Sequence, residues 1–260
     1  MNVANIVFVG AGNLATHLAK AFYRNGHRIL QVYSRTESSA RALAEKVGAD
    51  YTTDLHKLPT NDISLYAVSL TDSAFTELLP EMTTGREQAL WVHTAGSLSI
   101  DVWENRVKRY GVLYPLQTFS KQREVDFRNV PFFIEAAHKE DTEYLKTLVG
   151  SLSSKIYEAD SEQRKNLHLA AVFACNFVNH LYALSADILE TCDLPFELLL
   201  PLIDETARKI HELPPEYAQT GPAVRYDKNI MGKHLSMLTG QPEVQKIYRL
   251  LSENIRKNVY

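Results

Sequence analysis

The chain has 260 residues, 45% of them hydrophobic and 23% charged, and its 28 basic and 31 acidic side chains give a net charge of −3. This composition is ordinary for a folded globular protein and excludes a disordered or collagen-like chain. It lacks the excess of positive charge that binding along a nucleic-acid backbone requires, so we expect no nucleic-acid partner. The length suffices for a full hydrophobic core, and nothing in the composition demands an oligomer.

Cysteine usage and the apolar segments favour a cytoplasmic protein. Cys175 and Cys192 lie in a stretch with a helical pattern, which favours reduced thiols over a disulfide. No basic segment precedes the first short apolar run, so we expect no signal peptide. The longest apolar stretch, residues 167–189, is interrupted by polar residues such as His168 and Asn179. We therefore expect a buried helix there and no membrane partner.

The first 160 residues alternate short β-branched runs with helical patterns. The runs cover residues 6–9, 29–33, 63–68, 90–93, 112–114, 132–135 and 155–157. Apolar residues at intervals of three to four predict helices over 14–23 and 40–47, and Gly26 and Gly48 stand where these should end. Such alternation predicts an α/β domain with a mostly parallel sheet.

After residue 160 the pattern contains helices only. One long apolar helix is expected over 161–191, another from Pro195, and two more over 229–238 and 242–258. We therefore place a domain boundary at residue 160. Residues 1–160 form the α/β domain, and residues 161–260 form an all-helical domain.

A glycine-rich turn follows the first predicted strand. Residues 10–15 read Gly-Ala-Gly-Asn-Leu-Ala, which matches Gly-x-Gly-x-x-Ala between a strand and a helix. Gly10 allows the tight turn, and Gly12 lets the backbone approach a pyrophosphate at the positive end of the helix. The alternative, glycines that only form a turn, is weaker because strand, spacing and position all agree. We therefore expect a Rossmann-type domain whose turn binds a dinucleotide through Gly10, Ala11, Gly12, Asn13 and Leu14.

The end of the second strand indicates which dinucleotide binds. An NAD site usually presents an acidic residue there, about 20 positions after the fingerprint, to bind the ribose hydroxyls. Here the segment reads Ser34-Arg35-Thr36, with no acid before Glu37. Arg35 can pair with a 2′-phosphate, and Ser34 and Thr36 can donate hydroxyl hydrogen bonds. The sequence favours NADP over NAD, the alternative being that Arg35 is a solvated surface cation.

Two later strand ends carry further candidates for cofactor binding, because ligands of open α/β sheets bind at the carboxyl ends of strands. The candidates are Ser69 and Leu70 after one strand and Thr94, Ala95 and Gly96 after the next. The small Ala95 and Gly96 would let the nicotinamide ribose lie close to the backbone. Thr71 and Asp72 suit an N-cap and a cofactor contact equally well.

Several motifs together resemble a known family. They are residues 10–15, Tyr33-Ser34-Arg35, Val68-Ser69, residues 93–96, Tyr114-Pro-Leu-Gln-Thr-Phe119 and Thr220-Gly-Pro-Ala223. These resemble NADP oxidoreductases that combine a Rossmann-like domain with a C-terminal helical domain of unassigned function, similar to pyrroline-5-carboxylate reductases and the β-hydroxyacid dehydrogenase group. The resemblance implies NADP binding and a helical domain that commonly builds a homodimer. It implies no substrate. The Lys-x-x-x-Asn pair of the β-hydroxyacid dehydrogenases is absent, because Leu169 follows Lys165 at that spacing.

Three polar residues lie on the long apolar helix. At 100° per residue, His168, Asn176 and Asn179 fall on one sector of an ideal α-helix. Polar groups buried on such a face must find partners, which are the substrate, the cofactor amide, or side chains across a subunit interface. We expect His168 to donate a proton and Asn176 or Asn179 to orient the reacting group, the alternative being a structural histidine.

These features predict an NADP-dependent oxidoreductase that transfers a hydride between the nicotinamide and an imine or carbonyl of a small metabolite. The substrate is expected between the two domains, and the helical domain is expected to form a homodimer. No metal-ligand spacing is present, so no metal site is predicted. The alternative is a non-catalytic NADP-binding sensor whose helical domain contacts a protein partner. Asp227 either caps the helix that follows or helps Thr220 and Arg225 to close the substrate pocket, where Arg225 would select a carboxylate.

Overall fold

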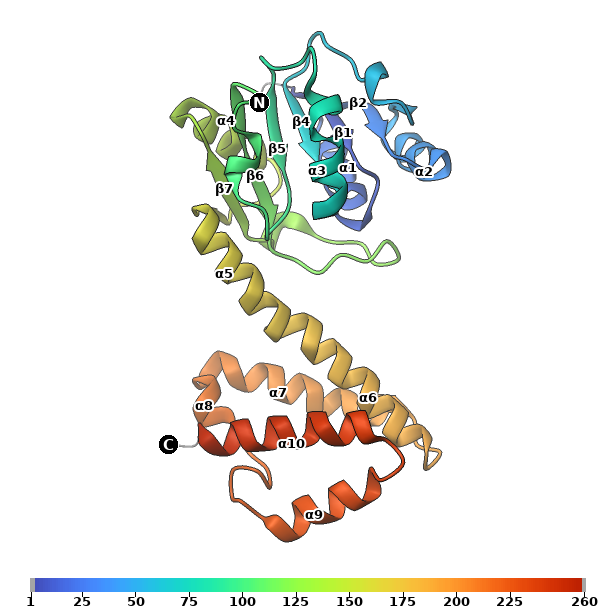
Figure 1. Cartoon of the computed structure of the whole chain (residues 1–260), viewed down its shortest axis with the longest axis vertical. Coiled ribbons are helices and arrows are strands. Elements are labelled where there is room, and N and C mark those ends of the chain that lie inside the picture. Colours follow the sequence, from blue (N-terminus) through green and yellow to red (C-terminus); the bar gives the residue numbers. More distant parts are fainter. Residues whose placement is uncertain (1–2, 259–260) are drawn as a thin grey trace. The chain divides into compact units, whose positions relative to one another are not determined.

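The computed structural model describes residues 3–258 and divides the chain into two compact units, residues 1–175 and 176–260. The first unit contains an eight-stranded sheet in the order β3-β2-β1-β4-β5-β6-β7-β8 (Figure 1). The strands are β1 (Asn5–Val9), β2 (Arg28–Tyr33), β3 (Asp50–Thr52), β4 (Leu65–Val68), β5 (Leu90–His93), β6 (Arg109–Pro115), β7 (Phe132–Ala136) and β8 (Ile156–Glu158). All neighbours pair in parallel except β6 and β7, which confirms the predicted mostly parallel sheet. The sequence pattern missed only the three-residue β3.

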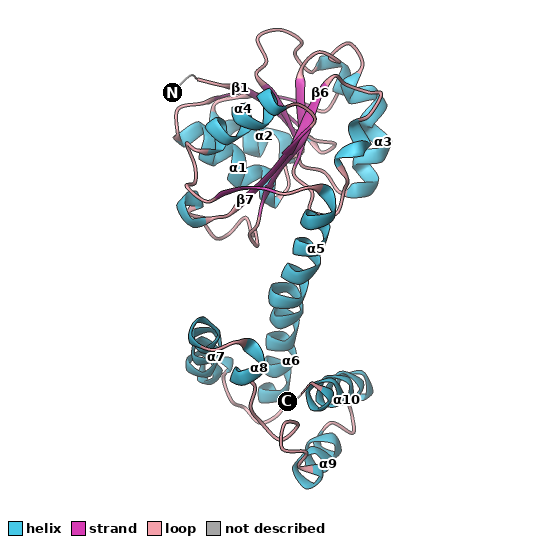
Figure 2. Ribbon diagram, turned by 90° about the vertical axis from the view of Figure 1, so that its left-hand side faces the viewer, coloured by secondary structure: helices cyan, strands magenta, loops and turns pink. Residues whose placement is uncertain are grey.

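Helices cover both faces of this sheet. The helices of the first unit are α1 (Asn13–Arg24), α2 (Glu37–Val47), α3 (Asp72–Thr83), α4 (Lys139–Val149) and α5 (Ser161–Ala171), with 3-10 turns η1 (Leu55–Lys57), η2 (Ile100–Trp103) and η3 (Phe127–Asn129). Figure 2 shows α1, α2 and α4 on one face and α3 on the other. Gly48 ends α2 at a φ of +60°, a left-handed conformation that glycine adopts without steric cost.

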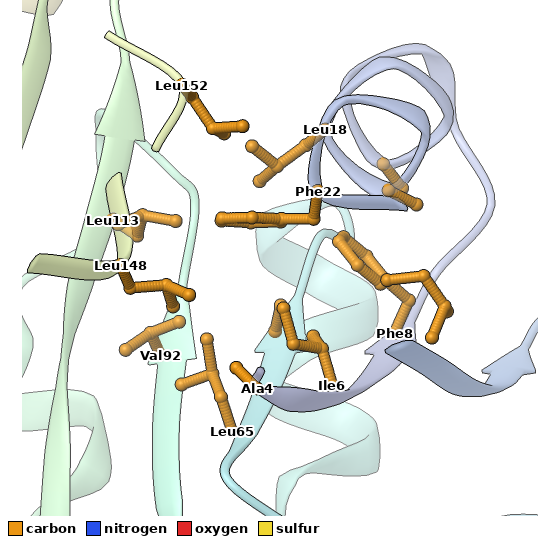
Figure 3. Close-up of a cluster of buried hydrophobic side chains, with 14 of the residues drawn as sticks. Ala4, Ile6, Phe8, Leu18, Phe22, Leu65, Val92, Leu113, Leu148 and Leu152 are labelled. Carbon is orange, nitrogen blue, oxygen red and sulfur yellow. The ribbon is translucent and has the colours of Figure 1, made fainter. Parts of the chain in front are cut away.

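Each face of the sheet has its own hydrophobic core. On one face, Leu18 and Phe22 of α1 pack against Ile6 and Phe8 of β1, and all four are 0% exposed (Figure 3). On the other face, Phe75 of α3 packs with a group of aromatic side chains that includes Trp91 and Trp103. A fully buried large apolar side chain contributes about 1.5–3 kcal/mol, so these two layers hold the sheet that presents the strand ends.

The second unit is helical. The chain enters it through a π-helical segment, η4 (Val172–Phe177), which continues α5 into α6 (Val178–Glu190), so the predicted long helix is confirmed apart from this local widening. The remaining elements are the 3-10 turn η5 (Phe196–Leu199) and the helices α7 (Leu200–Glu212), α8 (Pro215–Ala218), α9 (Lys228–Met237) and α10 (Pro242–Lys257). Asp227 caps α9 by accepting a hydrogen bond from the Ile230 N–H, so the structure supports the capping interpretation.

The expectation that the long apolar helix is buried is wrong for this chain. Residues 161–190 include an 18-residue window with a mean hydropathy of 1.4, long and apolar enough to cross a membrane, and none of that window is buried. In the described part of the second unit, only Ala223 and Leu238 are buried hydrophobic residues, whereas Leu202 and Met237 are 63% and 78% exposed. The composition shows how many apolar residues the chain has, but it does not show whether the chain covers them.

Candidate functional site

The carboxyl ends of the central strands are joined by backbone hydrogen bonds. The strand order reverses between β1 and β4, and in open α/β sheets the crevice at such a reversal is where ligands bind. The Gly10 N–H donates to the Tyr33 carbonyl at 2.9 Å, the Ser69 N–H to Val9 at 2.8 Å, and the Thr94 N–H to Val68 at 3.0 Å. The structure thus brings the four predicted cofactor-binding segments to one edge of the sheet.

Gly10 and Gly12 stand in different surroundings. Gly10 has a φ of +121°, and a Cβ placed on it would lie 2.1 Å from the carbonyl oxygen of Ser69. The fold itself therefore requires a glycine at position 10. Gly12 has a φ of −73°, and a Cβ placed on it would meet no atom within 4 Å. The space in front of Gly12 is open, which is what a backbone that receives a bulky ligand requires.

The N-terminus of α1 suits a phosphate group. Gly12 is its N-cap, no side chain caps the helix, and its first turn contains no acidic residue. The exposed Asn13 does not fill this role, because its Nδ2 donates to the Phe119 carbonyl at 3.0 Å. The first-turn N–H groups and the positive end of the helix dipole are thus free of a competing carboxylate. The residues present fit the pyrophosphate of a dinucleotide.

The segment after β2 has the charge expected for a 2′-phosphate. Arg35 is exposed, and within residues 3–258 its guanidinium forms no ion pair. The nearest following acid, Glu37, is engaged elsewhere, because it accepts from Arg41 at 2.7 Å and from the Tyr51 hydroxyl at 3.3 Å. The Ser34 hydroxyl accepts weakly from the Thr36 N–H at 3.4 Å. No free carboxylate of this segment therefore opposes an anionic ligand.

The ends of β4 and β5 are also joined by side chains. Thr71 caps α3 by accepting from the Ala74 N–H, which supports the capping interpretation of that residue. The Thr94 hydroxyl donates to the Val68 carbonyl, and the Ser97 hydroxyl donates to Asp72 at 2.7 Å. These bonds hold the two loops together beside Gly10.

His168 lies against the loop after β5. A Cβ placed on Gly96 would be 2.7 Å from both Cγ and Nδ1 of His168, so the imidazole fills the space that a side chain at Gly96 would need. The His168 ring thus explains why residue 96 is a glycine. The sequence did not show this, because the space at Gly96 was expected to receive the nicotinamide ribose. The Nδ1 of His168 also lies 3.0 Å from the hydroxyl of Tyr114, the residue before Pro115 at the end of β6.

A buried ion pair anchors the helix that carries His168. Arg164, one turn before His168, is 0% exposed and pairs with Glu135 of β7, and it also donates to the Leu98 carbonyl. The N–H and hydroxyl of Ser161 donate to the same carboxylate. Sequence reasoning missed Arg164 and Glu135, and it named Tyr114 only as part of a family motif, without a role in the site. The four-residue spacing of Arg164 and His168 was a usable signal, because it places both on one face of a helix.

Asn176 and Asn179 do not join this group within the first unit. Both belong to the second unit, both are exposed, and no hydrogen bond of either side chain is found within residues 3–258. The expectation of buried asparagines is therefore wrong for this chain. The π-helical segment also changes their angular position, because its i→i+5 bonding widens the turn that an ideal α-helix would make.

The Tyr-Pro-Leu-Gln-Thr-Phe motif continues into a loop that runs alongside α1. Phe119 and Ser120 offer their carbonyls to Asn13 and His17, and Glu124 pairs with Lys20 and Arg24. The four α1 residues are spaced by four, three and four positions, so they form one stripe along the helix. The loop is thus held beside the candidate phosphate site by the outer face of the same helix.

One group of potential metal ligands lies at the surface. The ligand atoms of Asp54, His56 and Glu81 are within 4.8 Å of one another, and His56 pairs with Glu81 at 3.3 Å. His56 and Glu81 are exposed, and Asp54 is half-buried. None of the three residues belongs to the candidate cofactor-binding segments after β1, β2, β4 and β5.

Family comparisons agree with this architecture. Residues 5–92 match a family described as "NADP oxidoreductase coenzyme F420-dependent", and residues 130–255 match a domain of unknown function, DUF2520. A crystal structure described as a "putative NADP oxidoreductase" from Bacteroides fragilis is 61% identical, covers 98% of each chain and has a TM-score of 0.95. The search of curated proteins found no match.

Two more distant structures share the fold. An imine reductase from Myxococcus stipitatus (V8 variant), in complex with NAD+, is 15% identical with a TM-score of 0.62, and the alignment covers 100% of this chain and 94% of the other. A pyrroline-5-carboxylate reductase from Coxiella burnetii is 16% identical with a TM-score of 0.60 over 99% of each chain. At these identities the likeness shows the fold alone.

Proposed function

Because this chain belongs to the NADP oxidoreductase family that pairs a Rossmann-type domain with a DUF2520 domain, we propose that it transfers a hydride between NADP and the imine or carbonyl of a small metabolite. The observation that carries this proposal is the position of His168. Its imidazole lies on Gly96 in the loop after β5, at the same edge of the sheet as the open space before Gly12. A titratable side chain thus stands at the edge where a dinucleotide would bind.

The side chains have distinct parts in this reaction. The nicotinamide supplies the hydride chemistry when bound. The first-turn amides of α1 bind the pyrophosphate, and the backbone at Gly12 leaves room for it. His168 donates the proton that the substrate oxygen or nitrogen takes up as its negative charge develops. The ion pair of Arg164 with Glu135 holds the helix so that His168 stays on Gly96.

We assign NADP rather than NAD on the charge of the segment after β2. Arg35 is exposed and unpaired within residues 3–258, and the carboxylate of Glu37 is already engaged by Arg41 and Tyr51. A 2′-phosphate supplies the anion that this arginine lacks, whereas the diol of NAD offers it no charge-assisted partner.

Replacing His168 by asparagine tests the proposed proton transfer. We expect turnover to fall by about 100-fold or more with little change in NADPH affinity, because a proton donor acts on the reacting atoms and not on the cofactor. The matched control is His138→Asn, which removes an exposed imidazole bonded only to the Lys108 carbonyl. Equal losses of folding stability and NADPH affinity in His168→Asn would identify a structural histidine.

A second candidate function is an NADP-binding sensor without catalysis. It is favoured by Lys165, which forms a surface pair with Glu162 at 2.9 Å and is followed four residues later by the exposed Leu169. No Lys-x-x-x-Asn pair is therefore available on this helix. A substrate-dependent change in absorbance at 340 nm, measured across a panel of carbonyl compounds and imines, separates the two functions.

We also propose that the protein is a homodimer through its helical unit. In this unit Leu198, Leu202 and Leu250 are each at least 60% exposed, and hardly any described hydrophobic residue is buried. So small a core cannot offset the entropy lost on ordering some 80 residues, whereas burying such side chains against a second copy contributes about 25 cal/mol per Å².

A further inference from the structure

The surroundings of Tyr114 and His168 indicate which of the two donates the hydrogen bond between them. The Tyr114 hydroxyl lies 3.0 Å from the His168 Nδ1, and the two rings meet edge to face with centroids 6.0 Å apart. Tyr114 is 7% exposed, and burial raises the pKa of its phenol, so the phenol keeps its proton at neutral pH. Within residues 3–258 no second acceptor is found for this hydroxyl. Nδ1 is thus the acceptor that the protein offers to this hydroxyl, and we infer that the O–H donates to it.

This direction determines where a neutral His168 carries its proton. A neutral imidazole has one N–H, and a nitrogen that accepts a hydrogen bond cannot be the protonated one. Since Nδ1 accepts from Tyr114, the proton is on Nε2. When the ring is protonated, Nδ1–H donates to the phenolic oxygen instead, and Nε2 keeps its proton.

Gly96 restricts the ring from a second side. A Cβ placed on this glycine would lie 2.7 Å from Cγ and Nδ1 of His168 and 2.8 Å from its Cβ. The Cβ–Cγ–Nδ1 side of the imidazole is therefore occupied by the Gly96 backbone and the Tyr114 hydroxyl. Nε2 has no hydrogen-bond partner in the described part of the chain, so it is the nitrogen left for a ligand.

We propose that Tyr114 is a positioning residue that keeps His168 a hydrogen-bond donor through Nε2, and that the site thereby selects a neutral carbonyl substrate over a protonated iminium. This inference rests on the proposed function and narrows it. A carbonyl oxygen has lone pairs that accept from Nε2–H, whereas the nitrogen of a protonated iminium has none. Two donors facing each other would leave both without a partner.

In the reduction of a carbonyl, the substrate takes a hydride from the cofactor and a proton from His168. The carbonyl carbon receives the hydride, and the electron pair of the C–O π bond takes the proton from Nε2 of the protonated ring. The products are an alcohol, oxidised NADP and a neutral imidazole whose remaining proton is on Nδ1, and Nε2 then regains a proton from the solvent. Arg164, one turn earlier on the same helix, pairs with Glu135 of β7.

Nitrogen-15 NMR of the histidine rings tests the positioning without substrate or cofactor. The His168 signals are assigned by their loss in His168→Gln, and we expect an unprotonated Nδ1 and a protonated Nε2 in the neutral ring. Tyr114→Phe should move the Nδ1 resonance to that of a nitrogen without a hydrogen bond. Gly96→Ala should displace the ring while keeping the hydroxyl of Tyr114, and it adds no backbone strain because Gly96 has no positive φ.

The matched control is Tyr110→Phe, on the same strand, which removes a hydroxyl that forms no hydrogen bond in the described part of the chain. It should leave the His168 signals unchanged. A proton on Nδ1 in the wild-type protein would overturn the proposal, as would a Tyr114→Phe spectrum identical to the wild type.

Steady-state kinetics test whether the site selects a carbonyl over an iminium. Tyr114→Phe should lower kcat for carbonyl compounds by about tenfold, the usual effect of one lost hydrogen bond, with unchanged NADPH affinity. The probe for the excluded class is 1-methyl-1-pyrrolinium, an iminium without a lone pair on nitrogen. We expect no NADPH-dependent reduction of it, and its reduction by the wild-type protein would refute the selection. Failure of every carbonyl and imine substrate would instead refute the proposed function, while the NMR result would still decide the positioning.

Discussion

Replacing either glycine of the fingerprint by alanine separates two roles that the same motif can have. At Gly10 a Cβ would lie 2.1 Å from the carbonyl oxygen of Ser69, and the φ of +121° is one that alanine rarely adopts. At Gly12 the φ is −73°, and a Cβ would meet no atom of the chain within 4 Å. The first substitution should therefore damage the fold, and the second should affect only what binds in front of the turn.

The sizes of the two effects follow from this geometry. For Gly10→Ala, backbone strain costs about 1–3 kcal/mol and the forced contact with Ser69 a further ~1–3 kcal/mol. The sum is a large fraction of the stability of a typical domain, ~5–15 kcal/mol. For Gly12→Ala, the reduced entropy of the unfolded chain and the poorer N-cap oppose each other, so the change in unfolding free energy should stay within about 1 kcal/mol.

Cofactor binding should respond in the opposite order. The methyl group added by Gly12→Ala enters the space that the proposed pyrophosphate occupies, and a forced contact of ~1–3 kcal/mol weakens NADPH binding by about 5- to 150-fold. Urea denaturation gives the unfolding free energies, and calorimetric titration gives the Kd for NADPH. If Gly12→Ala binds NADPH as tightly as the wild type, no dinucleotide lies against this glycine and the fingerprint is only a turn.

Four further outcomes follow from the structure. Arg35→Asp should reverse the preference for NADPH over NADH in calorimetric titrations, and an unchanged preference would show that Arg35 does not contact the 2′-phosphate. Arg164→Met should cost about 3–5 kcal/mol in urea denaturation, because it leaves the Glu135 carboxylate partly buried without its partner, and adding Glu135→Gln should restore part of the loss. Burial lowers the pKa of His93 to about 3, so stability should fall as the pH decreases from about 6.5 towards 3, where the unfolded chain binds a proton that the folded one does not; a His93→Gln variant with the same pH slope would exclude this cause. Light scattering at micromolar concentration should give the mass of two chains, and a monomer would refute the proposed homodimer.

Local patterns were sufficient for the fold class and for the cofactor edge of the sheet. The β-branched runs and the three-to-four spacing of apolar residues are properties of neighbouring residues, so they predicted the strands from β1 to β8 apart from the short β3. The glycine spacing after β1 and the absence of an acid before Glu37 likewise depend on a few adjacent positions. Parallel strands place all their carboxyl ends at one edge, so the gathering of these segments followed from the predicted topology.

The surroundings of His168 depended on residues far apart in the chain. Gly96, Tyr114 and Glu135 come from three different strand ends, and their contacts with α5 join positions 29 to 72 residues away. No local pattern distinguishes a glycine that receives a cofactor from one that receives an imidazole. Only the packed structure showed that the space at Gly12 is open and that the space at Gly96 is filled.

The helical unit shows the same division between sequence and tertiary structure. Its apolar periodicity predicted the helices from α6 to α10 apart from the short α8, because the period of 3.6 depends on residues within a few turns. Whether an apolar stripe is buried depends on which surface packs against it, and in this chain Leu202 and Met237 remain exposed. The sequence by itself determined the elements and the cofactor fingerprint, whereas the tertiary structure decided which side chains meet, because burial and hydrogen bonding are properties of pairs of segments and not of one.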